Sequence, residues 1–307
     1  MNTAARVFSP VLSSIDEAIG NTPLVRLRLP GLPPAVELWG KCEWFNPGGS
    51  VKDRTALSIV REGEKSGALG PGRTIIDSSS GNTAVGLALV GRARGYPVEL
   101  FMPASVALER RRICQAYGAT VTLTDAFSGS DGALLAVRER VAEEPARYFY
   151  ADQYRNPANP LAHYRTTGPE IWEQTGGRLT HFVAGIGTSG TVVGTGRYLR
   201  ERTPRPRVIA VEPDEPLHGL EGMKHLPSAI VPEIYDPSVE DQKVRVATED
   251  GYRMCREALD HAGLLLGHSG GAALWAAREL ARSLVSGVVV VLLPDGGERY
   301  LGADHAR

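Results

Sequence analysis

The chain contains 307 residues, of which 42% are hydrophobic and 22% are charged, and its formal net charge is −1. This composition is typical of a globular protein that is long enough to form two domains. A nearly neutral chain has no overall attraction for nucleic acid or for an anionic membrane, and neither is an expected partner. No stretch is long and apolar enough to span a bilayer, and Met1–Pro10 lacks the charged and apolar regions of a signal peptide.

Cysteine and histidine usage argues against disulfides and structural metals. The three cysteines are Cys42, Cys114 and Cys255, an odd number without the spacing of metal ligands. The seven histidines show no HxxxH spacing. We therefore expect reduced thiols, a cytoplasmic protein and no metal site.

Apolar runs that are typical of strands alternate with helix-like segments along the whole chain. Strands are expected, in chain order, at Val36–Cys42, Thr74–Ile76, Pro97–Phe101, Thr120–Leu123, His181–Val183, Arg207–Val211 and Val288–Leu292. Helical spacing is clearest in Ala107–Tyr117 and Tyr252–Leu264. The alternation predicts an α/β fold with mostly parallel sheets flanked by helices. No linker separates the halves, so we expect two lobes that exchange segments, with ligands bound where loops from both converge.

The first informative loop, Asn46–Arg54, is polar and rich in glycine, and it delivers Lys52 to the predicted start of a helix. Cations are disfavoured there because the helix dipole presents its positive end. A lysine in this place has a destabilised ammonium group, which is what a Schiff-base lysine requires. On spacing alone, a solvated helix start remains the alternative.

Two further loops follow predicted strands. Ser78–Thr83 gathers hydroxyls and backbone amides at a helix N-terminus. This pattern is equally typical of a carboxylate or phosphate cradle and of an ordinary serine-rich cap. Gly185–Thr191 offers unobstructed backbone amides and three hydroxyls, which suit a phosphate dianion. The same run fits GxGxxG, with Glu212 about 20 residues further on, so a NAD-dependent oxidoreductase stays open at this point.

Two more glycine-rich loops, Gly267–Gly271 and Pro294–Leu301, complete a set of five. In this order the five loops resemble those of the cysteine synthase family, which are pyridoxal-phosphate (PLP) enzymes of fold type II. The similarity runs from Ile19–Val25 to Arg299–Leu301. It includes Glu109–Arg111, Tyr117–Ala119, Asn156–Asn159 and Thr167–Glu170. The resemblance removes most of the support for a dinucleotide site. It implies PLP as the cofactor and an active site in the cleft between two lobes.

The resemblance also implies a role for each matching residue. Lys52 matches the lysine that forms a Schiff base with PLP and then acts as acid and base. Asn82 matches the residue that hydrogen-bonds the 3′ oxygen of PLP, and Ser269 matches the serine that faces the pyridine nitrogen. The PLP phosphate is expected at Gly187, Thr188, Ser189, Gly190 and Thr191. The substrate carboxylate is expected at Ser79, Ser80, Gly81, Thr83 and Gln153.

Some positions depart from the usual family pattern or bear on the subtype. His268 stands where an aliphatic residue is usual, and Gly270 and Ala84 also depart from common residues. Lys224 lies where B-type relatives, including users of O-phosphoserine, carry arginine. This favours O-phosphoserine slightly over O-acetylserine, because a cation would stabilise a departing phosphate. A solvated surface lysine is the alternative.

The resemblance therefore predicts PLP-dependent β-replacement that makes L-cysteine from O-phosphoserine or O-acetylserine. The sulfur donor would be sulfide, thiosulfate or the thiocarboxylate of a small sulfur-carrier protein. Other β-replacements, giving a diaminopropionate-type product or cystathionine, stay open. A homodimer is expected. The smaller, mobile lobe is assigned residues 1–11 and 46–155, with the lysine and the carboxylate loop, and the larger lobe 12–45 and 156–307.

Overall fold

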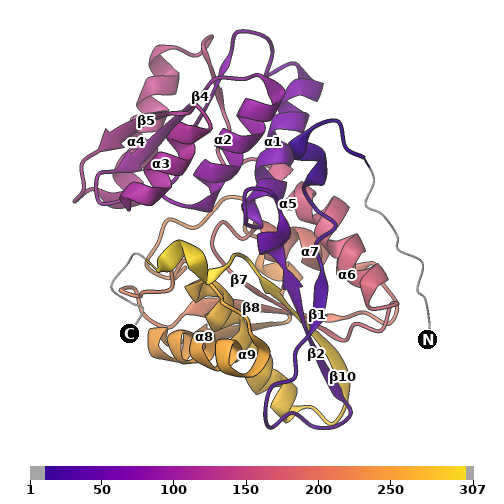
Figure 1. The fold of residues 1–307 in the computed structure, drawn as a ribbon. Helices are drawn as coiled ribbons and strands as arrows, with labels where there is room; N and C mark the ends of the chain where they lie inside the picture. The colour runs from indigo at the N-terminus through magenta and orange to yellow at the C-terminus, as the bar shows by residue number, and fades with distance from the viewer. Residues whose placement is uncertain (1–10, 302–307) are drawn as a thin grey trace.

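The computed structural model describes residues 11–301, which form two sheets flanked by helices (Figure 1). The six-stranded sheet has the order β1-β2-β10-β7-β8-β9, and the four-stranded sheet has the order β5-β4-β3-β6. Strand β1 runs antiparallel to β2, whereas the other pairs are parallel. The predicted α/β class is confirmed. Residues 1–10, assigned above to the smaller lobe, lie outside the described residues.

The elements follow one another in the expected alternation. The strands are β1 (Leu24–Arg26), β2 (Val36–Cys42), β3 (Thr74–Ser78), β4 (Val98–Pro103), β5 (Thr120–Thr124), β6 (Tyr148–Tyr150), β7 (His181–Gly185), β8 (Arg207–Pro213), β9 (Gln242–Val246) and β10 (Gly287–Leu293). The α-helices are α1 (Lys52–Ser66), α2 (Asn82–Arg94), α3 (Leu108–Ala116), α4 (Gly129–Glu143), α5 (Ala158–Ala162), α6 (Gly168–Gln174), α7 (Gly190–Arg200), α8 (Thr248–Ala262) and α9 (His268–Ser283). A π-helical turn, η3 (His163–Thr167), joins α5 to α6, and short 3-10 helices include η1 (Ile15–Ala18), η2 (Glu43–Phe45) and η5 (Gly297–Tyr300).

All seven predicted strands are present, but β1, β6 and β9 were missed. Each of the three lies at the edge of its sheet. An edge strand buries fewer side chains, so it lacks the continuous apolar run by which a central parallel strand is recognised.

The six-stranded sheet has a hydrophobic core on both faces because successive side chains of a strand point in opposite directions. On β10, Val289 and Val291 pack with α8 and α9, whereas Val290 and Leu292 pack with α6 and α7. The uninterrupted valine run of β10 thus reflects burial on both sides. We call this sheet with α5–α9 the larger lobe.

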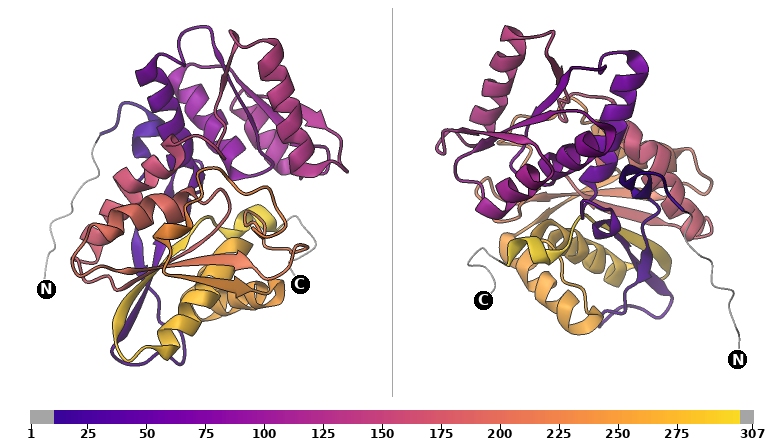
Figure 2. Two further views of the ribbon diagram at one scale, coloured as in Figure 1. Left: turned by 180° about the vertical axis from the view of Figure 1, so that it is seen from behind. Right: turned by 45° about the horizontal axis from the view of Figure 1, so that its top comes forward.

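The four-stranded sheet is covered in the same way. Ile75 and Leu100 pack against α1 and α2, and Ile76 and Phe101 face α4. We call this sheet with α1–α4 the smaller lobe. It lies above the larger lobe in the views of Figures 1 and 2.

A buried ion-pair network joins the two lobes beneath α1. Arg54 of α1 donates to Glu43 at 2.7 Å and to Glu170 at 2.6 Å, and Lys41 donates to Glu170 at 2.6 Å. The Arg54 and Lys41 side chains are essentially inaccessible to water. Because an unpaired buried charge is costly, the network holds the start of α1 against β2 and α6.

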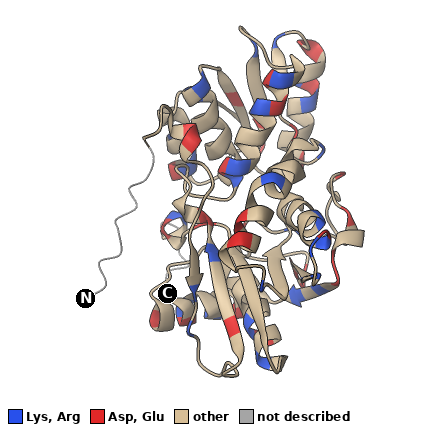
Figure 3. Cartoon of the chain, turned by 90° about the vertical axis from the view of Figure 1, so that its right-hand side faces the viewer, with Lys and Arg blue, Asp and Glu red and all other residues tan. Residues whose placement is uncertain are grey.

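Charges elsewhere are interspersed over the visible face (Figure 3), in keeping with the net charge of −1. Within residues 11–301 no helix combines the length and the apolarity needed to cross a membrane. The three cysteines are free thiols. In the same part of the chain, no three His, Cys, Asp or Glu side chains are grouped to hold a metal ion.

Candidate active site

One cavity of about 960 Å³ collects the predicted site residues. All of them except Gly190 line its wall. The contributing loops follow β3 in the smaller lobe and β7 and β10 in the larger lobe, at the carboxyl ends of these strands. The cavity thus lies where an α/β fold binds its ligands.

Lys52 is the first residue of α1, as predicted. Its backbone N–H donates to the Ser50 hydroxyl at 3.2 Å, and the preceding Val51 N–H donates to the Pro294 carbonyl at 2.9 Å. Burial lowers the pKa of the Lys52 amine, and the negative charges of Asp295 and Glu43 oppose this only in part. A fixed amine with a destabilised charge is suited to bond a carbonyl group and to carry protons.

The loop from β7 into α7 fits a phosphate. Ser189 has φ +72°, and its buried hydroxyl has no hydrogen-bond partner within residues 11–301. A Cβ on Gly187 would lie 2.3 Å from the Gly222 carbonyl oxygen, and one on Gly190 would lie 1.9 Å from Asn159 Oδ1. An unsatisfied hydroxyl and side-chain-free backbone at a helix N-terminus form the kind of cradle that the PLP phosphate requires.

The two threonines of this loop, Thr188 and Thr191, contact side chains that lie outside the loop. Asn159 Nδ2 donates to Thr188 Oγ1 at 3.0 Å and to the Gln153 carbonyl at 2.7 Å. Thr191 Oγ1 lies 3.3 Å from Nε2 of His163, which belongs to the π-helical turn. These contacts fix the shape of the loop before any ligand arrives, which lowers the cost of ordering it on binding.

The predicted carboxylate-binding groups come from the segment after β3 and, for Gln153, from the segment after β6. Thr83 Oγ1 donates to Gln153 Oε1 at 2.6 Å, and Gln153 Nε2 donates to the Ser78 carbonyl at 3.2 Å. A Cβ on Gly81 would meet nothing within 4 Å, so the space in front of the loop is open. These hydrogen bonds fix Thr83 and Gln153 beside a space that a carboxylate can enter.

Ser269 is the second residue of α9, and its side chain is buried on the cavity wall. The facing loop approaches closely at Gly222, where φ is +85° and a Cβ would lie 4.0 Å from Ser269 Oγ. This wall therefore presents a neutral hydroxyl to the cavity.

Sequence reasoning missed the roles of Asp295, Arg299 and Tyr300. Asn82 Nδ2 donates to Asp295 Oδ2 at 2.7 Å, and Arg299 donates to Asn82 Oδ1 at 2.7 Å. The Tyr300 hydroxyl also donates to Asp295, at 2.6 Å. Both amide atoms of Asn82 are thus engaged by the segment that follows β10. The available signal was an acidic residue two positions after the last apolar strand.

Asp295 is almost fully buried, and its Oδ1 atom has no partner in the part of the chain that the structure describes. Burial raises the pKa of this carboxyl, against the opposing effect of the hydrogen bonds from Tyr300 and Asn82. The group is therefore a proton-sensitive neighbour of Lys52.

Lys224 is half-buried and lies on the cavity wall. Its backbone N–H donates to the Ile186 carbonyl at 2.8 Å, and its Nζ lies 5.0 Å from the centre of the Tyr154 ring. Burial lowers the pKa of its amine, and Asp131 opposes this. Lys224 thus brings a cation to the chamber that contains Lys52.

His268 packs between two aromatic rings behind the site. The ring centres of Tyr252 and Tyr300 lie 4.6 Å and 4.7 Å from that of His268. The histidine that stands here in place of the usual aliphatic residue therefore contacts both Tyr252 and Tyr300 with its ring.

Glu212 occupies a different environment from that of a ribose-binding carboxylate. It is buried within β8 and forms an ion pair with Arg245 at 3.2 Å. A carboxylate engaged in this way does not complete a dinucleotide site.

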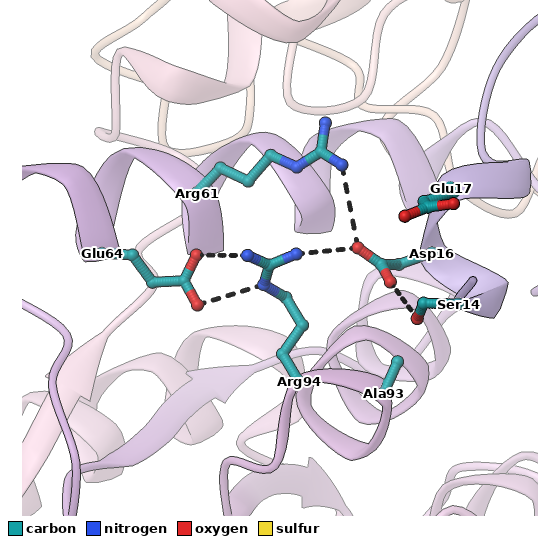
Figure 4. Close-up of a pocket in the computed structure, with 7 residues that line it drawn as sticks. All are labelled: Ser14, Asp16, Glu17, Arg61, Glu64, Ala93 and Arg94. Carbon is teal, nitrogen blue, oxygen red and sulfur yellow. Dashed lines mark hydrogen bonds and ion pairs between the residues drawn. The ribbon is translucent and has the colours of Figure 1, made fainter. Parts of the chain in front are cut away.

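A second hollow of about 290 Å³ lies at η1, α1 and α2 (Figure 4). Its charged side chains satisfy one another, because Arg94 contacts Asp16 at 2.8 Å and Glu64 at 2.7 Å. The hollow is an ion-pair cluster that joins η1 to α1 and α2.

Comparisons with known proteins agree with this geometry. Residues 15–295 match the family model described as "Pyridoxal-phosphate dependent enzyme". The chain is 52% identical to a cysteine synthase of Aquifex aeolicus, over 94% of this chain and 90% of that protein. It is 39% identical to cysteine synthase B of Escherichia coli, over 94% of this chain and 95% of that protein. A crystal structure of O-acetyl serine sulfhydrylase isoform 3 from Entamoeba histolytica matches with a TM-score of 0.92 and 36% identity, covering 100% of this chain and 94% of that one. The chain therefore belongs to the cysteine synthase family of pyridoxal-phosphate-dependent enzymes.

Proposed function

We propose that the protein makes L-cysteine by replacing the β-substituent of an O-activated serine with sulfur, using PLP. One observation carries this proposal. A single cavity is lined by Lys52, by Ser269 and by residues of two loops, the phosphate loop (187–191) and the substrate loop (79–83). When bound, PLP supplies an electron sink that makes the α-hydrogen acidic and allows the β-substituent to leave.

The residues of this chain then divide the remaining tasks. The phosphate loop from Gly187 to Thr191 anchors the cofactor, and the loop from Ser79 to Thr83 with Gln153 holds the substrate carboxylate. Lys52 Nζ takes the α-proton and returns it at the end, which its lowered pKa favours. Walls from both lobes exclude water from the reacting atoms.

The neutral Ser269 hydroxyl favours expulsion of a β-substituent over chemistry that needs a long-lived carbanion. A carboxylate here would keep the pyridine nitrogen protonated and strengthen the electron sink. Ser269→Asp should therefore slow β-replacement while PLP stays bound. Unchanged turnover would contradict this role.

The position of the half-buried Lys224 on the cavity wall supports O-phosphoserine as the donor, slightly ahead of O-acetylserine. Lys224→Met should raise KM for O-phosphoserine by about tenfold, the effect of losing about 1.4 kcal/mol of charge-assisted binding, and change KM for O-acetylserine little. Equal effects on both donors would remove the argument for phosphate.

The sulfur donor, the partners and the lobe boundaries complete the proposal. We assign sulfide, thiosulfate or a carrier thiocarboxylate as donor, a homodimer as the assembly, and the cytoplasm, with its reduced thiols, as the compartment. The smaller, mobile lobe comprises 1–11 and 46–155 and the larger lobe 12–45 and 156–307. The two sheets support this division, because the four-stranded sheet uses only segments between residues 74 and 150.

The experiment that tests the function combines a spectrum with product analysis. The purified protein should acquire visible absorption with PLP and should form cysteine from either activated serine and sulfide. Lys52→Ala should abolish both the protein-bound absorption and the turnover. A protein that stays colourless with PLP, or that forms a diaminopropionate or cystathionine but no cysteine, refutes the proposal.

A further inference from the structure

We propose that Arg110 and Glu221 form an interlobe latch that closes the active-site cavity and positions the substrate loop. The proposal rests on the proposed function, since it concerns the same cavity. Arg110 lies on α3 of the smaller lobe, and Glu221 lies in the segment after β8 of the larger lobe. Their side chains form an ion pair at 2.5 Å, and both line the cavity.

Arg110 makes three contacts that converge from different parts of the chain. Beside the pair with Glu221, its Nη1 atom donates to the Ser80 carbonyl of the substrate loop at 3.3 Å. Its guanidinium lies 5.4 Å from the centre of the Tyr300 ring, at cation–π distance. One side chain thus holds the substrate loop against two elements of the larger lobe.

The exposure of the pair places it where the cavity meets solvent. The Arg110 side chain is 21% exposed and the Glu221 side chain 42% exposed, whereas Ser269 on the wall of the same cavity is buried. An ion pair at such an edge forms and breaks at low cost, because water solvates either charge when it separates. The pair can therefore open for a ligand and close behind it.

The latch is also connected to the cofactor-facing residues. Tyr300, under the Arg110 guanidinium, donates to Asp295, and Asp295 accepts from Asn82. Closure of the latch therefore also orders the contacts of Tyr300 with Asp295 and of Asp295 with Asn82. We assign Arg110 and Glu221 as positioning residues, which act through the Ser80 loop and Tyr300.

The test uses the intact PLP-loaded protein and a readout that does not depend on turnover. Quenching of bound-PLP fluorescence by acrylamide, a neutral probe, reports how open the cavity is. Arg110→Gln and Glu221→Gln should each raise the quenching constant severalfold. Arg112→Gln and Glu215→Gln are matched controls, because both residues are exposed and lie on the same helix and the same segment as the latch residues. The controls should leave quenching unchanged.

Kinetics and pairwise coupling give the second readout. Both variants should raise KM for the activated serine by on the order of tenfold with a smaller change in kcat, and Arg110→Lys should restore part of the loss. The double variant should be no worse than Arg110→Gln alone, since the two charges act as one pair. In the wild type, added salt should raise quenching, but in Glu221→Gln it should not.

Two outcomes overturn the latch: quenching and KM equal to the wild type in both single variants, or fully additive effects in the double variant. Failure of the proposed function is distinguishable from these. If no cysteine is formed but the quenching pattern holds, the latch stands without that chemistry. If cysteine is formed while quenching is unchanged, only the latch falls.

Discussion

Replacement of Gly190 by alanine is a direct test of the phosphate loop. Gly190 is the first residue of α7, and a Cβ there would lie 1.9 Å from Asn159 Oδ1. Its backbone has an ordinary negative φ, so the added methyl group alone perturbs the site and alanine otherwise favours the helix. Asn159 must therefore move away from its present position.

The cost follows from what Asn159 holds. Its Nδ2 atom donates to Thr188 Oγ1 and to the Gln153 carbonyl, and both contacts are buried. Each buried polar group that is left unsatisfied costs about 1–3 kcal/mol. Loss of both contacts costs about 2–6 kcal/mol together. Borne entirely by PLP binding, this corresponds to a rise of at least about 30-fold in the Kd for PLP.

The measurement is a PLP titration followed by visible absorption, with thermal unfolding of the apoprotein as a check on folding. Gly70→Ala is the matched control, because a Cβ there meets nothing within 4 Å and its φ is not positive. The control should bind PLP like the wild type. A folded Gly190→Ala protein with wild-type PLP affinity would refute the assignment of this loop to the phosphate.

Two further predictions concern stability. Glu170→Ala leaves the buried charges of Lys41 and Arg54 without their shared partner, so we expect the free energy of unfolding in urea to fall by about 3–5 kcal/mol. The exposed control Glu173→Ala should change it by no more than about 0.5 kcal/mol. Equal losses in the two variants would contradict the network. Burial raises the pKa of Asp77 to about 8 in the folded protein. Below about pH 4 the carboxyl is neutral in both states and does not reduce stability. Between about pH 4 and 8 the unfolded state loses this proton first, so the free energy of unfolding falls by up to about 1.4 kcal/mol for each pH unit. Asp77→Asn does not ionise, so its stability relative to the wild type should rise across this window, and a constant difference would show that Asp77 is not the titrating group.

The amino-acid sequence alone determined the features that are local along the chain. Buried strands such as β10 are marked by continuous apolar runs, and Lys52 is marked by the polar glycine-rich turn before it. The five loops each consist of consecutive residues, so their order carried the family resemblance. Local propensity and local hydrogen bonding suffice to specify such elements.

Only the tertiary structure decided which distant residues meet. The pair Arg110–Glu221 is separated by 111 positions and the pair Asn82–Arg299 by 217. The same holds for the edge strands, for the position of Lys224 on the cavity wall and for the charge interaction of Asp295 with Lys52. These features depend on how two lobes pack and on which side chains lose water in doing so, and no periodicity within one segment encodes that outcome.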